Sequence, residues 1–268
     1  ALLAVQGKEP AFAQLQESRD GFARDLALLT AGGENAGVNL PPSSASAQEA
    51  LAELAKTWER ARASADTILA AKPILIELGR AFDTVNAGNA GLLDAAEQLT
   101  GRMAQAGSSN RDLAAANQLV MLTQRIAKNA NLLHVSETID PESAFLLSKD
   151  TSDFAERVRG LSSGNETLRL TAQRNADVRE QLDTLARIFT EYQTTVVSVV
   201  QRLKNLVASK QAGLALFSDS EKLLELLLQF KANGISSILI SHKLSEVNKL
   251  ADSITIIRND AYRAADYT

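Results

Sequence analysis

The chain has 268 residues, of which 45% are hydrophobic and only 4% aromatic, and its formal net charge of −4 arises from both signs mixed along its length. This composition is typical of helices packed on helices rather than of a sheet sandwich, and the absence of a basic segment argues against nucleic-acid binding. The chain has no cysteine, which excludes a disulfide scaffold and a thiolate metal site.

Membrane-spanning segments are not expected. No apolar run reaches the roughly 18 residues that a membrane span needs, and the start of the chain, ALLAVQGKEP, is too short for a signal peptide. We therefore expect a soluble polypeptide. A start without Met or a helix cap is compatible with a soluble piece cut from a membrane protein.

Six helices are predicted by apolar residues that recur at alternating spacings of three and four, the pattern of helices packed side by side. They cover about 8–31, 46–71, 73–106, 110–135, 142–162 and 176–211. The clearest run begins at Val178 and continues without a break through Leu185, Phe189 and Leu203. We expect the residues of these repeats to be buried.

The fold class predicted from these helices is all-α. At 1.5 Å per residue the longest helix would run about 50 Å, which exceeds one compact bundle. We therefore expect elongated antiparallel bundles, with two stacked modules of four-helix type that share long helices. The predicted domains are a helical domain over 1–218, a closing segment over 219–260 and a tail over 261–268.

Polar side chains occupy four of the predicted core positions, at Arg19, Asn89, Asn129 and Thr151. They either set the register of the helices or reach water at the edge of the core. The alternative is a ligand site inside the bundle.

One helical segment resembles a known family. Residues 115–133 read AANQLVMLTQRIAKNANLL, and the part MLTQRIAK resembles the signature of PilJ-type sensory modules, the periplasmic parts of methyl-accepting receptors for type IV pili. Similar stretches are RVRGLSSGN (157–165), DTLARIFTEYQTTV (183–196) and VASKQAGLALFSDSEKLL (207–224). The resemblance covers about residues 5–224.

The resemblance implies a non-enzymatic periplasmic sensory domain of an inner-membrane chemotaxis receptor that controls twitching motility. It implies membrane helices in the full-length receptor, a receptor homodimer, and a signal from pilin, another periplasmic protein or a small ligand. No cofactor is implied.

The family motif places candidate ligand-binding residues at Asn117, Gln124 and Arg125. Where the family has Gln-Arg before Met-Leu, this chain has Leu119-Val120, and this departure argues against an anion ligand at that place. For Gln124 and Arg125, bonding to neighbouring helices is the alternative role.

Enzyme chemistry has no support in the sequence. His134 and His242 are far apart, and the chain has neither metal-ligand spacing nor a GxSxG motif. We predict no catalytic residues, no metal and no cofactor.

The C-terminal stretch resembles a second family. Residues 221–260, EKLLELLLQFKANGISSILISHKLSEVNKLADSITIIRND, are similar to the C-terminal part of sugar-type ABC transporter ATPases. The resemblance implies that His242 stands at the switch histidine that contacts the γ-phosphate in a complete ATPase. Because the chain has no GxxxxGK[ST] phosphate loop, we expect it not to bind ATP. A fragment of an ABC-ATPase-related nucleotide-binding or transport protein remains the alternative function.

Two conformations are compatible with this stretch. Ile-rich runs favour strands at 237–240 and 253–257, with a helix at 243–251 between them. The 3–4 repeat also continues to Ile254, which favours one closing helix over about 219–255 after a chain reversal near Gly213. We predict the helix, because two strands alone make a marginal sheet and docking a helix buries several apolar side chains at about 1.5–3 kcal/mol each.

Overall fold

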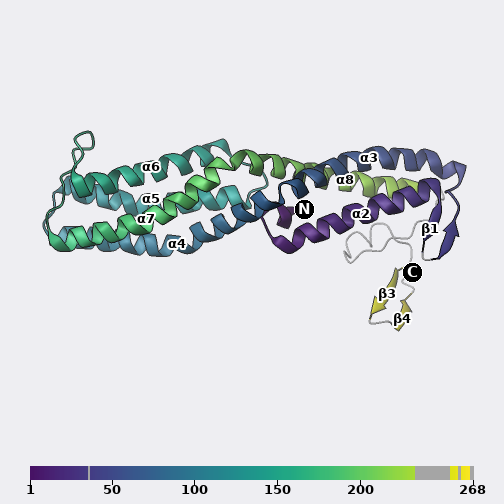
Figure 1. The fold of residues 1–268 in the computed structure, drawn as a ribbon, viewed down its shortest axis with the longest axis horizontal. Coiled ribbons are helices and arrows are strands. Elements are labelled where there is room, and N and C mark those ends of the chain that lie inside the picture. The colour runs from purple at the N-terminus through teal and green to yellow at the C-terminus, as the bar shows by residue number, and fades with distance from the viewer. Residues whose placement is uncertain (36, 233–253, 259–260, 266–268) are drawn as a thin grey trace. The chain divides into compact units, whose positions relative to one another are not determined.

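A computed structural model of the protein describes residues 1–35, 37–232, 254–258 and 261–265, and over these residues the fold is all-α with two small hairpins (Figure 1). The helices are α1 (Leu2–Val5), α2 (Glu9–Ala31), α3 (Ala45–Ala70), α4 (Lys72–Gln105), α5 (Asn110–Val135), α6 (Pro141–Ser163), α7 (Ala176–Gln201) and α8 (Leu203–Ala232). The predictions of an all-α fold and of five of the six helices are confirmed.

The chain divides into two compact units. The first unit contains residues 1–15 and 67–214, and the second contains residues 16–66 and the chain from 215 onward. Helices α2, α3 and α8 each contribute to both units. Residue 218, the predicted domain boundary, lies inside α8.

The predicted helix over 176–211 and the predicted reversal near Gly213 are wrong. Helix α7 ends at Gln201, Arg202 leaves helical geometry at φ −100°, and α8 then runs through Gly213 to Ala232. The added Cβ of a residue at position 213 would lie 3.5 Å from Val5 Cγ2. This is an ordinary van der Waals distance, so packing does not require glycine at this position, and α8 continues through Gly213 in spite of a helix cost of about 1 kcal/mol.

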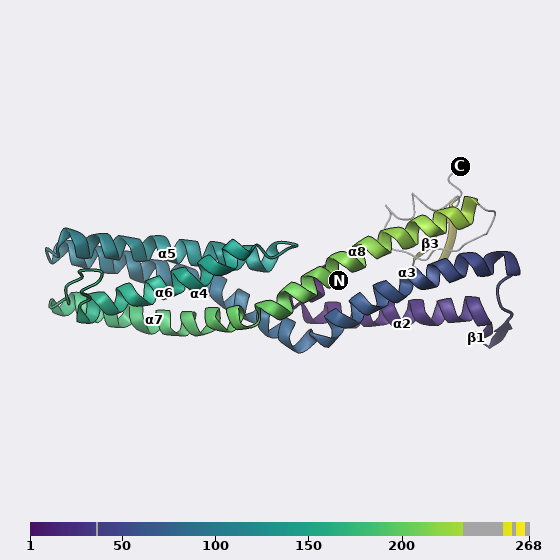
Figure 2. The ribbon, with the colours of Figure 1, turned by 90° about the horizontal axis from the view of Figure 1, so that it is seen from above.

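The first unit is built on an antiparallel four-helix bundle of α4, α5, α6 and α7 (Figures 1 and 2). Each helix packs on the next in sequence, and α7 returns to α4, as short connections between antiparallel helices require. Side chains at the N-caps fix where helices begin: Ser109 accepts from the amide of Asp112, and Asp140 accepts from the amides of Glu142 and Ser143.

The core of this bundle is formed by the residues that the repeat predicts. Leu185 is fully buried, and Phe189, 3% exposed, stacks on Phe154 with ring centroids 4.1 Å apart. Leu203 is half-buried beside the break between α7 and α8, which the sequence did not reveal. The burial prediction is therefore confirmed for this bundle, with Leu203 only partly enclosed.

The second unit packs α2, α3 and the second half of α8 around a small apolar core. Its buried members are Leu26, Leu51, Leu54, Trp58, Ala61, Leu223 and Phe230. Phe22 stacks on Trp58 with centroids 4.3 Å apart. Leu29 was predicted to be buried but is 48% exposed, because it lies in the last turn of α2, past Leu26, the last α2 residue in this core.

A hairpin not predicted from the sequence joins α2 to α3. Strands β1 (Gly33–Asn35) and β2 (Val38–Leu40) pair antiparallel, with Gly33 opposite Leu40. Gly32, at φ +73°, precedes β1, and a Cβ on it would lie 2.7 Å from the carbonyl oxygen of Leu40. Only glycine fits this left-handed, close position.

The predicted closing helix is correct only in part. Helix α8 covers 219–232, but Ile254 begins strand β3 (Ile254–Arg258), which pairs antiparallel with β4 (Ala261–Ala265). A helix reaching 255 is therefore wrong, because the β-branched run favours extended backbone and finds a partner strand close by in sequence. The predicted strand at 237–240 and helix at 243–251, together with His242, lie outside the described residues.

Candidate functional site

Helix α5 positions the three candidate residues that the family motif marks. Its buried side contains Leu119, Leu122 and Ile126 in the bundle core. Asn117 and Gln124 are exposed and stand seven residues apart, which places them on the same side of the helix about 10 Å from each other. With Met121, which lies between them and is 48% exposed, they form a short strip on the outer surface of the first unit.

Arg125 points to α6 rather than into this strip. Its Nη2 lies 2.9 Å from Oδ1 of Asp150, whose side chain is completely buried while that of Arg125 is 41% exposed. Burial raises the pKa of Asp150, because a carboxylate is poorly solvated in the core, and the Arg125 charge offsets part of this rise. The structure therefore separates Arg125 from Asn117 and Gln124 by giving it an internal partner.

A second polar contact crosses the same helix pair. Arg157 of α6 donates from Nε to Oε1 of Gln118 on α5 at 2.7 Å and from Nη1 to the carbonyl oxygen of Asp153. Asp153 in turn accepts from Lys149. The α5–α6 pair is thus joined by charged and polar side chains as well as by its apolar core.

No sequence motif marks Lys210 of α8. Lys210 is only 6% exposed, and its Nζ donates to the carbonyl oxygens of His134, at 3.1 Å, and Ser136. These carbonyls end α5, so the ammonium group caps the C-terminus of that helix. Burial lowers the pKa of Lys210. Its position four residues after the core residue Leu206 was the available sequence signal.

His134 has a structural role in the same region. Its ring stacks on Phe82 with centroids 4.6 Å apart, and its Nε2 lies 3.4 Å from the carbonyl oxygen of Gln6. Burial lowers the pKa of His134, which favours the neutral ring. The histidine therefore serves packing between α1, α4 and α5.

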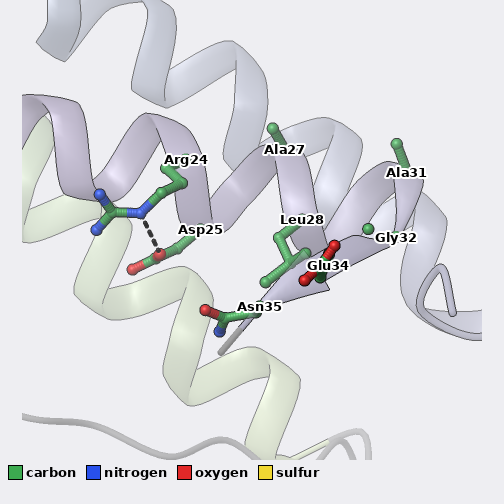
Figure 3. Close-up of a pocket in the computed structure, with 9 residues that line it drawn as sticks. Arg24, Asp25, Ala27, Leu28, Ala31, Gly32, Glu34 and Asn35 are labelled. Atoms are coloured by element: carbon green, nitrogen blue, oxygen red, sulfur yellow. Dashed lines mark ion pairs between the residues drawn. The ribbon is translucent and has the colours of Figure 1, made fainter. Parts of the chain in front are cut away.

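The three candidate residues do not line the pocket found in the second unit. This pocket has a volume of about 300 Å³ and lies between the end of α2 and β1 (Figure 3). Polar side chains of Arg24, Asp25, Glu34 and Asn35 surround it, and the Nε of Arg24 pairs with Asp25 at 3.6 Å. The opposite charges of that pair largely neutralise each other.

Two kinds of site are not found among the described residues. No group of three His, Asp or Glu side chains in this part of the chain is arranged to hold a metal ion. Among the helices that the structure describes, none combines the length and the apolar character that a membrane crossing needs.

The fold and these contacts define an all-helical bundle domain with an exposed strip on α5 and an ion pair between α5 and α6. Residues 1–84 and 102–214 match the family described as "Type IV pili methyl-accepting chemotaxis transducer N-term", PilJ. The chain belongs to this family. It is therefore an N-terminal domain of a type IV pilus chemotaxis transducer.

Individual relatives agree with this assignment and add a second likeness. The chain is 24% identical over 235 residues to Protein PilJ of Pseudomonas aeruginosa, a match that spans 88% of this chain and 34% of PilJ. It is 36% identical over 107 residues to the L-arabinose transport ATP-binding protein AraG of Geobacillus stearothermophilus, spanning 38% of this chain and 21% of AraG.

A shorter match to another transport protein has higher identity. The chain is 52% identical over 42 residues to the xylose import ATP-binding protein XylG of Thermoanaerobacter pseudethanolicus, which spans 16% of this chain and 8% of XylG. The chain thus spans about a third of the length of PilJ, 21% of AraG and 8% of XylG. The resemblance to an ABC ATPase is confined to part of the chain.

Proposed function

We propose that the protein is the periplasmic sensory domain of an inner-membrane methyl-accepting receptor that controls type IV pilus twitching motility. The observation that carries this proposal is the family match over 1–84 and 102–214, which covers most of the first helical unit and residues 16–66 of the second. The domain acts by binding rather than by catalysis, and it works as part of a receptor homodimer. Membrane helices belong to the full-length receptor.

The signal in this proposal is pilin, another periplasmic protein or a small ligand that contacts the outer side of α5. Asn117 and Gln124 support this placement because both are exposed and lie on one side of the helix. Arg125 contributes from the flank through its exposed part, while its guanidinium is held by Asp150. A surface strip of this kind fits a protein partner better than an enclosed ligand.

The receptor role is tested with a hybrid receptor. Residues 1–232 replace the matching part of PilJ in a Pseudomonas aeruginosa strain that lacks its own pilJ gene, and the twitching zone on agar is measured. We expect the hybrid to restore twitching above the level of the deletion strain. A hybrid that reaches the membrane in normal amount but leaves twitching at the deletion level contradicts the proposal.

The α5 strip gives a sharper prediction. Changing Asn117 and Gln124 together to Ala in the hybrid is expected to reduce twitching at least several-fold toward the deletion level. The melting midpoint of the purified domain should stay unchanged, because substitutions at exposed sites usually alter stability by less than about 0.5 kcal/mol. Arg111→Ala, at an exposed position about 120° around α5 from Asn117, is the control. If the double variant twitches as well as the control variant, Asn117 and Gln124 are ordinary solvent-exposed residues without a role in signalling.

The second candidate function, nucleotide binding, is favoured by the matches to AraG and XylG. The chain has no phosphate loop, so we predict that Mg-ATP leaves its melting midpoint unchanged. A ligand at one hundred times its Kd would stabilise the fold by about 2.7 kcal/mol, which a thermal-shift assay detects easily. A shift that is lost in His242→Ala would favour the ATPase-related function instead.

A further inference from the structure

One buried cation joins the start of α8 to the end of α5 within the first unit. Lys210 lies about two turns into α8 and donates from Nζ to the carbonyl oxygens of His134, at 3.1 Å, and Ser136. Among the hydrogen bonds between residues that the structure describes, no other connects α5 or its C-cap to α8. The polar contact between these two helices therefore depends on a single ammonium group.

Lys210 has no counter-ion among the described residues, where no Asp or Glu side chain pairs with it. Burial lowers the pKa of Lys210, because the charged form loses its water. The loss is offset by the last carbonyl groups of α5, which have no partner within the helix and carry partial negative charge. A buried charge without partners is strongly destabilising. The ammonium group and the end of α5 therefore hold each other in place.

The bundle fixes the end of α5 from its other sides. The ring of His134 stacks on Phe82 of α4, and the neighbouring Leu133 is only 1% exposed. Along its length α5 packs on α4 and α6. The carbonyl groups that bind Lys210 are therefore presented by a firmly packed part of the first unit.

The start of α8, in contrast, is not fixed by the helix before it. Arg202 separates α7 from α8 with φ −100° and ψ 5°, and Leu203 begins α8. Element ends of this kind absorb the change in backbone angles when one helix turns against another. The direction of the first turns of α8 therefore has to come from their tertiary contacts.

The other buried side chains in these turns give little directional restraint. Leu206 and Ala212 are 1% and 9% exposed, and apolar burial is non-directional. Ser209 is buried as well, but its hydroxyl has no hydrogen-bond partner. The two hydrogen bonds of Lys210, about 12 Å along the helix from the break, are thus the contacts that specify one direction.

We propose that Lys210 is a latch: its ammonium group holds the first turns of α8 against the end of α5, and α8 turns about the break at Arg202 when the latch opens. A displacement of the end of α5 is then passed to α8 through this side chain. The latch is built from contacts within the first unit, and it does not rest on the receptor role or on the signal.

Spin labels in the purified chain test the latch. The chain has no cysteine, so cysteines introduced at the exposed positions Asn131 on α5 and Gln211 on α8 take up labels at these two places only. Double electron–electron resonance then measures the distribution of distances between the labels. We expect a narrow distribution with Lys210 in place, and a broad or displaced one in Lys210→Met, which keeps a long side chain without the charge. Lys210→Arg, which keeps a cation, should preserve most of the narrow distribution.

Ser209→Ala is the matched control, because it changes the neighbouring buried residue of α8 and removes a hydroxyl without a partner. We expect it to leave the α5–α8 distribution unchanged. A second label pair, at Asn131 and the exposed Glu191 of α7, should give the same distances in every variant, since α7 precedes the break.

Three results overturn the proposal. The first is a broad α5–α8 distribution while Lys210 is in place, which needs no substitution at this residue. The second is an unchanged distribution in Lys210→Met. The third is an equal change at the α5–α7 pair in Lys210→Met, because the substitution would then loosen the whole bundle instead of releasing α8.

Discussion

Replacing Leu185 by alanine is expected to lower the free energy of unfolding by about 2–5 kcal/mol. Leu185 lies on α7 in the first unit and has no exposed surface. The substitution removes buried methyl groups and leaves a cavity that the four surrounding helices cannot fill. Chemical denaturation followed by circular dichroism measures the loss as a shift in the midpoint of unfolding.

Leu132→Ala is the matched control for this prediction. Leu132 is on α5 of the same unit but is 37% exposed, so its loss removes less buried surface and leaves no enclosed cavity. We expect a change of about 0.5 kcal/mol or less. Equal losses in the two variants would mean that the bundle core is not packed as described.

Replacing Arg125 by alanine is expected to cost up to about 3 kcal/mol at pH 7, because the change leaves the buried Asp150 carboxylate without its cation. The cost lies at the low end for a broken buried pair, since the Arg125 side chain is 41% exposed and solvent screens it. Adding Asp150→Asn should recover most of the loss, because no charge then remains buried. The four unfolding free energies of this cycle measure the coupling.

The pH dependence of this cycle has a definite sign. Burial raises the pKa of Asp150, so the folded protein holds this proton more tightly than the unfolded chain. The contribution of Asp150 to stability is therefore fully present below its unfolded pKa and is lost as the pH rises through its folded pKa. The loss in Arg125→Ala should accordingly be small in acid and grow toward neutral pH.

Unfolding curves of Arg125→Ala and of the double variant with Asp150→Asn, recorded from acid to neutral pH, test this sign. We expect the two curves to converge in acid and to separate as Asp150 ionises. A loss that is the same at every pH would mean that Arg125 acts through the packing of its aliphatic stem rather than through its charge.

The candidate site was only partly predictable from the sequence. The motif indicated Arg125, but its partner Asp150 lies on another helix and precedes the predicted core residue Thr151 by one position. Thr151 itself donates to the carbonyl oxygen of Leu147, within its own helix. Asn89, which the repeat marked as a polar core position, is half-buried, with its Oδ1 enclosed.

The sequence by itself determined where five helices run, because their 3–4 repeats and capping residues act within a few turns of one chain segment. It also determined the family, through residues that lie along those helices. Only the tertiary structure showed that α8 runs through Gly213 to Ala232, where it packs Leu223 and Phe230 into a core with residues of α2 and α3 that are distant in sequence. It likewise decided that Ile254 begins a strand, because a β-branched run takes extended backbone once a partner such as 261–265 supplies the hydrogen bonds.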